Sequence, residues 1–168
     1  CVRFARRPFD KNGALAARGR ADEALVKKLL AQKYFRQKPP KSLDKNEFGE
    51  NYLNRWFSRI KNPADLLATL NLFTASCVAD ALENFVPAPL RRQIIVSGGG
   101  AYNKTLLENL KRLTGLPVIT SARAGIDPQA KEAAAFALMA WLALQGKTNH
   151  CARATGARKN GILGSITL

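Results

Sequence analysis

Three consecutive glycines follow a short apolar run and are the most informative local feature of the sequence. Gly98, Gly99 and Gly100 follow residues 93–96 after the single residue Ser97, and a helical pattern begins soon after them. Glycines let the backbone approach a ligand closely, and the start of a helix offers free N–H groups to an anion or a polar nucleoside edge. The triplet fits neither G-x-G-x-x-G, because Asn103 replaces the last glycine, nor a P-loop. A purely structural tight turn is the alternative.

Two polar residues near helix starts could also bind a ligand. Asn103 could contact a ligand or could cap the helix that follows it. Glu132 precedes the apolar residues 133–136, where an unpaired buried carboxylate would be costly, so it could accept hydrogen bonds from substrate hydroxyls. The alternative for Glu132 is favourable first-turn placement against the helix dipole.

The sulfur and imidazole groups do not form a recognisable site. Cys1, Cys77 and Cys151 are an odd number, are widely separated and lack C-x-x-C spacing, and the chain has one histidine. Neither a disulfide framework nor a metal site is expected. Cys77 lies in an apolar helical stretch and is interpreted as a small buried hydrophobe. A dyad of His150 and Cys151 lacks an evident orienting acid.

The candidate residues lie in a part of the sequence where predicted strands alternate with predicted helices. Residues 93–96 and 117–120 read as buried strands on either side of a helix that Gly115 closes, so a parallel βαβ unit with a right-handed crossover is expected. An Ala-rich helix over 130–144 should be capped by Gly146. Residues 161–166 could return as a last strand.

The first part of the chain reads as helices joined by turns and prolines. Residues 8–13 carry turn chemistry, and helices are predicted over 22–32 and about 48–60. Asn62 and Pro63 begin the longest predicted helix, which ends before Pro87. The length of 168 residues suits one compact domain with an appended segment.

The chain is strongly basic. Lys and Arg total 27 against 12 Asp and Glu, which gives a net charge of +15. Sixteen basic residues lie within 1–61, but the aromatic residues sit at helix-core spacing rather than between the charges. Nucleic-acid binding is therefore less expected than a solvated or interfacial basic face. The absence of about 18 uninterrupted apolar residues and of a signal-peptide pattern argues against a membrane segment and favours the cytoplasm.

Several stretches together resemble the C-terminal half of the anhydro-N-acetylmuramic acid kinase family. They occur in the family's order over nearly the whole chain. The matching stretches are PFDKNGA at 8–14, PPKS at 39–42, SGGGAYN at 97–103, DPQAKEAAAFA at 127–137, ATGA at 154–157 and ILG at 162–164.

The resemblance implies a ribonuclease-H-like α/β domain of the actin, hexokinase and sugar-kinase superfamily. It implies ATP with Mg²⁺ as cosubstrate, phosphorylation of the sugar's 6-oxygen and water-driven opening of the 1,6-anhydro ring in cell-wall recycling. By the same resemblance, Gly98, Gly99, Gly100 and Asn103 would lie at the adenosine side of the cleft, and Glu132 would contact the sugar. Residues 1–62 would form a connector with peripheral helices, and residues 63–168 the C-terminal nucleotide-binding lobe.

The resemblance also predicts what this chain lacks. In the family, the glycine-rich phosphate loop and the Asp that activates the attacking water precede the matched region, so no catalytic residue is expected in this chain. Because phosphoryl transfer depends on positioning and charge neutralisation, the chain alone should be inactive. The expected partners are ATP or ADP, the anhydro amino sugar and the missing N-terminal lobe, and a homodimer is allowed. A basic nucleic-acid-binding module and a degenerate non-catalytic α/β module are the alternatives.

Overall fold

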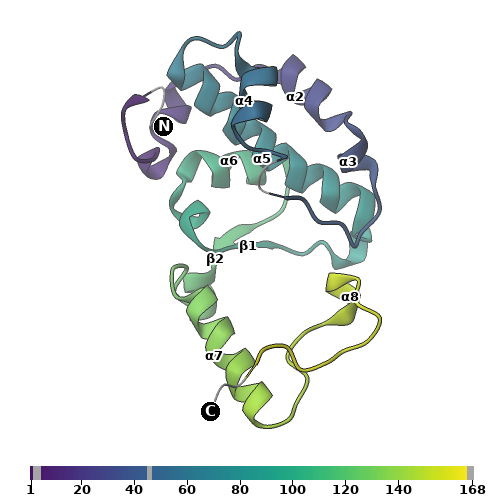
Figure 1. Ribbon diagram of the computed structural model, residues 1–168. Coiled ribbons are helices and arrows are strands. Elements are labelled where there is room, and N and C mark those ends of the chain that lie inside the picture. The colour runs from purple at the N-terminus through teal and green to yellow at the C-terminus, as the bar shows by residue number, and fades with distance from the viewer. Residues whose placement is uncertain (2–4, 45–46, 166–168) are drawn as a thin grey trace.

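The computed structural model describes residues 1, 5–44 and 47–165, and it shows a mixed α/β protein with a helical body and a small parallel sheet (Figure 1). The strands are β1 (Ile94–Val96) and β2 (Val118–Thr120). The helices are α2 (Glu23–Leu30), α3 (Lys33–Arg36), α4 (Glu50–Phe57), α5 (Pro63–Phe85), α6 (Lys104–Thr114), α7 (Lys131–Leu144) and α8 (Ala152–Thr155).

Helix α5 is the central element of the helical body. It begins as predicted, with the Asn62 side chain accepting a hydrogen bond from Ala64 N at 2.8 Å and Pro63 in the first turn. Within the described residues, α5 is the one helix long and apolar enough to cross a membrane. Leu66 and Leu72 on this helix are nevertheless buried inside the protein, which is the position of a core helix.

One hydrophobic core joins the N-terminal helices to α5. Val26, Leu29, Phe35 and Phe57 pack with buried α5 side chains, and Leu29 is fully buried. The rings of Phe35 and Phe73 meet edge to face with centroids 5.7 Å apart. Residues on both sides of position 62 therefore share this core.

The predicted βαβ unit is confirmed. Strands β1 and β2 pair in parallel with Ile94 opposite Val118, and α6 connects them. Gly115 ends α6 in the left-handed conformation at φ 67°, where its N–H donates to Lys111 O. The prediction that these strands are buried is wrong, because no residue of β1 or β2 is buried and Ile95 is 51% exposed. No element in the described part of the chain covers the face of the sheet that carries Ile95.

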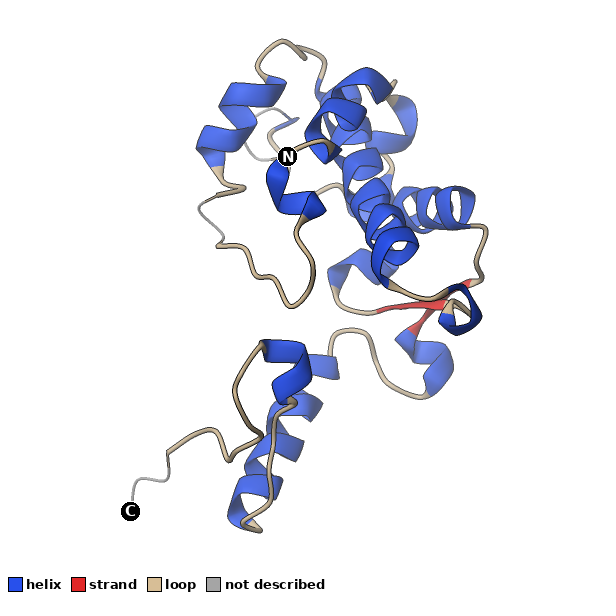
Figure 2. Ribbon diagram, turned by 90° about the vertical axis from the view of Figure 1, so that its right-hand side faces the viewer, coloured by secondary structure: helices blue, strands red, loops and turns tan. Residues whose placement is uncertain are grey.

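Helix α7 lies away from the helical body (Figures 1 and 2), and the C-terminal segment approaches that body where Gly156 lies beside Pro40. Gly146 ends α7 as predicted, with φ 65° and its N–H bonded to Ala143 O. No α7 residue is buried, although the helix is apolar on most sides. The prediction of a last strand is wrong for residues 161–165, which form no strand, and Ile166 lies outside the described residues. The Asn149 side chain bonds this stretch through Leu163 N and O, which satisfies backbone groups that a sheet would have paired.

Candidate functional site

A cavity of about 810 Å³ lies where the glycine turn after β1 faces the turn before η1 (Lys11–Gly13). Apolar side chains, one lysine and backbone from both turns contribute to its wall. The lining residues are Cys1, Pro8, Phe9, Asp10, Lys11, Asn12, Leu67, Gly99, Gly100, Tyr102, Asn103 and Gln129.

The three glycines contribute differently to this cavity. Gly98 has φ 70°, and its N–H donates to Pro128 O at 2.8 Å, so this residue shapes the turn and does not line the cavity. Gly99 and Gly100 do line it. Among the hydrogen bonds between described residues, none uses the N–H of Gly99 or of Gly100. Adjacent free N–H groups of this kind form a concavity that attracts anions.

Asn103 both caps α6 and lines the cavity. Its Oδ1 accepts hydrogen bonds from Leu106 N at 3.0 Å and from Asn71 Nδ2 at 3.2 Å. The capping interpretation from the sequence is therefore confirmed. Both acceptor positions of Oδ1 are occupied, which leaves Nδ2 as the group through which Asn103 could bind a ligand.

The turn over residues 8–13 forms the opposite wall of the cavity. Asp10 fixes the turn, since its two carboxylate oxygens accept from Leu15 N at 2.8 Å and Ala16 N at 2.9 Å. The turn is tied to α6 by Thr105 Oγ1, which donates to Gly13 O at 2.8 Å. From sequence chemistry this stretch was predicted only as a turn. Its place in the cavity depends on a contact across 92 residues of sequence, which no local pattern reveals.

Glu132 is not part of this cavity. It is exposed in the first turn of α7 and is absent from the lining residues. Its neighbours on α7 are exposed as well, so the apolar surroundings expected for its carboxylate are not provided by the described residues. Its contact with a sugar stays a prediction.

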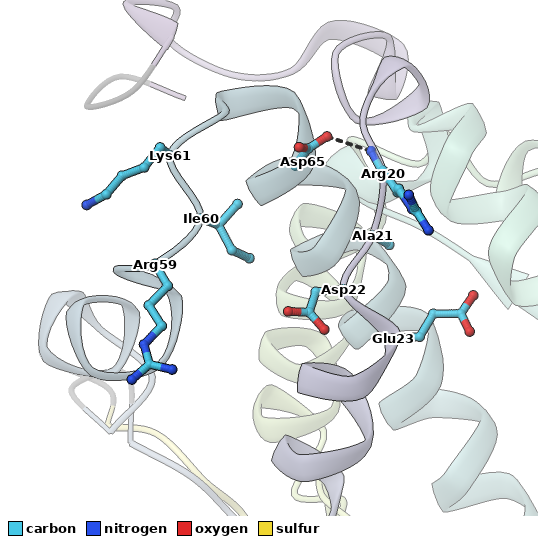
Figure 3. Close-up of a pocket in the computed structure, with 8 residues that line it drawn as sticks. All are labelled: Arg20, Ala21, Asp22, Glu23, Arg59, Ile60, Lys61 and Asp65. Atoms are coloured by element: carbon cyan, nitrogen blue, oxygen red, sulfur yellow. Dashed lines mark hydrogen bonds between the residues drawn. The ribbon is translucent and has the colours of Figure 1, made fainter.

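A second cavity, of about 760 Å³, lies between α5 and the segments that precede α2 and α5 (Figure 3). Its lining combines the cations Arg20, Arg59 and Lys61 with three carboxylates. Asp65 accepts a hydrogen bond from the Arg20 backbone N at 2.7 Å, and the Asp22 side chain caps α2. Because the Asp22 carboxylate already caps α2 and the Asp65 carboxylate already accepts from a backbone N–H, the cavity offers mixed surface charge rather than a defined ligand site.

Among the described residues, the two groups with shifted pKa values are partly buried and pack against the core. Burial, with a smaller contribution from the nearby Asp80 charge, raises the pKa of Cys77 to about 12. Burial also raises the pKa of Tyr52, against the hydrogen bond from Gln32. A protonated thiol that packs against the core is not a nucleophile, so Cys77 behaves as the expected hydrophobe.

The remaining candidate groups are also accounted for. His150 Nδ1 lies 3.0 Å from Gly161 O, and Cys151 is exposed and directly precedes α8. Across residues 1, 5–44 and 47–165, no three His, Cys, Asp or Glu side chains are grouped so as to hold a metal ion.

Comparison with known proteins identifies the family. The profile described as anhydro-N-acetylmuramic acid kinase matches residues 1–168. Curated proteins of that name share 36% identity over 95% of this chain in Caldanaerobacter subterraneus subsp. tengcongensis and 36% over 99% in Clostridioides difficile. The relative in Xanthomonas oryzae pv. oryzae is 42% identical over 99% of this chain. The chain spans 42%, 45% and 44% of these three relatives, which is less than half their length. This chain belongs to the anhydro-N-acetylmuramic acid kinase family.

Proposed function

We propose that this chain is the nucleotide-holding part of an ATP-dependent anhydro-N-acetylmuramic acid kinase. The whole enzyme would transfer the γ-phosphoryl group of ATP to the 6-oxygen of 1,6-anhydro-N-acetylmuramic acid, while water opens the anhydro ring. The product would be N-acetylmuramic acid 6-phosphate, formed in the cytoplasm during cell-wall recycling. Family membership over the full chain supports the reaction, and the cavity at the glycine turn supports the assignment of this part.

The cavity's chemistry is the observation that carries the nucleotide assignment. Gly99 and Gly100 offer two N–H donors that no described residue uses, Asn103 offers Nδ2, and Lys11 adds a positive charge. These groups suit phosphate or ribose oxygens. Phe9 is 63% exposed and Tyr102 is 47% exposed on the same cavity, and such rings suit a nucleobase.

The rest of the enzyme would complete both the fold and the site. We propose a ribonuclease-H-like core in which residues 63–168 form most of the nucleotide-binding lobe. Residues 1–62 would add helices that share its hydrophobic core, and residues 8–12 would supply the opposite wall of its cavity. A helix that is apolar on most sides is normally buried, yet Phe136, Trp141 and Leu144 on α7 are more than half exposed. Likewise, short parallel strands are normally covered on both faces. We propose that the family's remaining N-terminal lobe covers these surfaces and brings the sugar to Glu132.

The described residues of the cavity offer Mg²⁺ a single carboxylate, that of Asp10. Both Asp10 oxygens accept hydrogen bonds from backbone N–H groups, so this carboxylate holds the turn in place. Any Mg²⁺ that accompanies ATP would therefore be held by phosphate oxygens and by residues beyond this cavity. No residue of this chain is assigned a catalytic role, because the family's phosphate loop and its water-activating Asp precede the matched region. The chain alone should therefore bind nucleotide without turnover. A homodimer stays a prediction.

Nucleotide binding tests the proposal directly. A fluorescent N-methylanthraniloyl derivative of ADP would be titrated into the protein and into Gly99→Val and Gly161→Val. A Cβ at Gly99 meets nothing within 4 Å, so valine there should fold and project into the open space beside the turn. Gly161→Val is the matched control because a Cβ there makes only an ordinary contact with His150, away from the cavity. We expect Gly99→Val to weaken binding about tenfold or more and the control to leave it unchanged.

Salt dependence separates the kinase assignment from nucleic-acid binding. If the basic surface binds RNA or DNA, the affinity for an oligonucleotide should fall steeply and linearly with the logarithm of salt concentration, and Gly99→Val should not affect it. ADP binding that is unaffected by Gly99→Val, together with tight salt-sensitive oligonucleotide binding, would rule out the proposed function. Product formation would be assayed after the N-terminal part of a family member is supplied.

A further inference from the structure

A chain of side-chain amides runs from the surface of α6 through the protein to the candidate cavity. Arg112 Nη2 donates to Asn109 Oδ1 at 3.2 Å, and Asn109 Nδ2 donates to Asn71 Oδ1 at 3.0 Å. Asn71 Nδ2 then donates to Asn103 Oδ1 at 3.2 Å. Asn71 is 8% exposed, so its amide depends on these protein partners rather than on solvent.

The donor and acceptor of every hydrogen bond in this series of amides are fixed by the residues at its two ends. At the cavity end, Leu106 N can only donate, so Asn103 must present Oδ1 to it. At the surface end, the Arg112 guanidinium can only donate, so Asn109 must present Oδ1 there and Nδ2 towards Asn71. Asn71 can satisfy both neighbours only in one orientation. The two ends therefore favour the same direction throughout.

We infer that Asn71 and Asn109 are positioning residues that hold the Asn103 amide with Nδ2 free to donate to a ligand. The inference rests on the proposed function, because the ligand it concerns is the nucleotide. Turning the Asn103 amide over would lose two hydrogen bonds and place its Nδ2 against the donors Leu106 N and Asn71 Nδ2. The fixed orientation selects a ligand atom that accepts a hydrogen bond, such as a ribose or phosphate oxygen or a ring nitrogen.

The test changes Asn109, which does not line the cavity, so that the Asn71 amide is expected to turn over. Asn109→Asp keeps the side-chain shape but removes the donor to Asn71, and its carboxylate favours an Asn71 amide turned the other way. Asn71 would then present its oxygen to Asn103 Oδ1, so the hydrogen bond that holds the Asn103 amide in its orientation would be lost. We expect the affinity for the fluorescent ADP derivative to fall about tenfold. Asn160→Asp, which makes the same charge change in an exposed loop, is the matched control.

A double-mutant cycle distinguishes positioning from a general structural effect. Asn103→Ser retains a capping oxygen but has no amide to orient. Asn109→Asp should therefore weaken nucleotide binding in the otherwise native chain and have little effect in the Asn103→Ser background. An equal fold-loss in both backgrounds would overturn the inference. If Asn109→Asp does not fold, Arg112→Leu at the exposed end should give a smaller loss that also vanishes in the Asn103→Ser background.

A ligand-free measurement tests the inference separately from the proposed function. The side-chain NH₂ resonances of Asn103 would be followed by ¹H–¹⁵N NMR without nucleotide. We expect Asn109→Asp to shift these resonances, because the Asn103 amide loses its fixed orientation, whereas Asn160→Asp should not. Unchanged Asn103 resonances would refute the positioning role. Shifted resonances in a protein that binds no nucleotide would support the amide chain and refute the proposed function.

Discussion

Replacing Gly13, a buried glycine between exposed residues, with alanine should destabilise the protein strongly. Gly13 has φ 72°, a conformation that costs an L-residue about 1–2 kcal/mol. A Cβ at this position would also overlap Asn103 Oδ1 and lie 2.8 Å from Thr105 Oγ1. The substitution should therefore displace the capping side chain of α6 and break the bond between Asn103 and Asn71.

The magnitude follows from the contacts that would be lost. Loss of an asparagine cap costs about 0.5–2 kcal/mol. A buried donor on Asn71 left without a partner adds about 1–3 kcal/mol. Together with the backbone contribution of about 1–2 kcal/mol, the expected loss is about 2.5–7 kcal/mol, because all three effects act at once. A loss of that size is a large part of the roughly 5–15 kcal/mol that is typical of a whole domain.

Urea unfolding followed by circular dichroism would measure this loss, with Gly115→Ala as the matched control. Gly115 has a similar φ of 67°, but a Cβ there meets nothing within 4 Å. The control should therefore lose only the backbone contribution of about 1–2 kcal/mol. Equal losses in the two variants would show that the contact between Gly13 and Asn103 contributes nothing, and the account of this turn would be wrong.

Three further substitutions test the core. Leu29→Ala should lower the unfolding free energy by about 2–5 kcal/mol in urea denaturation, whereas Leu90→Ala, at a 68% exposed position, should change it by less than about 0.5 kcal/mol. Thr69→Val should cost about 1–3 kcal/mol because it leaves a backbone N–H at the start of α2 unpaired, while the exposed Thr74→Val should cost much less. The raised pKa of Cys77 means that the unfolded chain loses this proton first, so its contribution to stability is complete below pH 9.0 and declines between 9.0 and about 12. Urea unfolding of both proteins across that pH range should show this decline in unfolding free energy in the native chain and not in Cys77→Ala. The same pH dependence in both proteins would contradict the prediction.

Local signals in the sequence predicted most of the elements. Caps at Asp22, Asn62 and Asn103 bond to N–H groups two or three residues away, so their residue types identify helix starts directly. Gly115 likewise ends α6 for a reason contained in its own backbone. The parallel strands followed from the order strand, helix, strand, since antiparallel neighbours do not need a helical crossover.

Exposure and the C-terminal stretch could not be predicted in the same way. Apolar strands and an apolar helix imply burial only if something covers them, and the described residues provide no cover for Ile95 or for most of α7. The sequence of 161–165 is compatible with a strand, but strand formation requires a neighbouring edge. Bonds to Asn149 replaced that edge in this protein.

The candidate site shows the same division between local and distant information. The sequence by itself determined that a glycine turn and a capping asparagine follow β1, because those features depend on neighbouring residues. Only the tertiary structure decided that residues 8–13 face this turn, that Asn71 occupies one acceptor position of Asn103, and that Glu132 lies elsewhere. Which polar atoms remain free to bind depends on partners dozens of residues away, and their positions are set by the packing of α5 against α6 and not by local sequence.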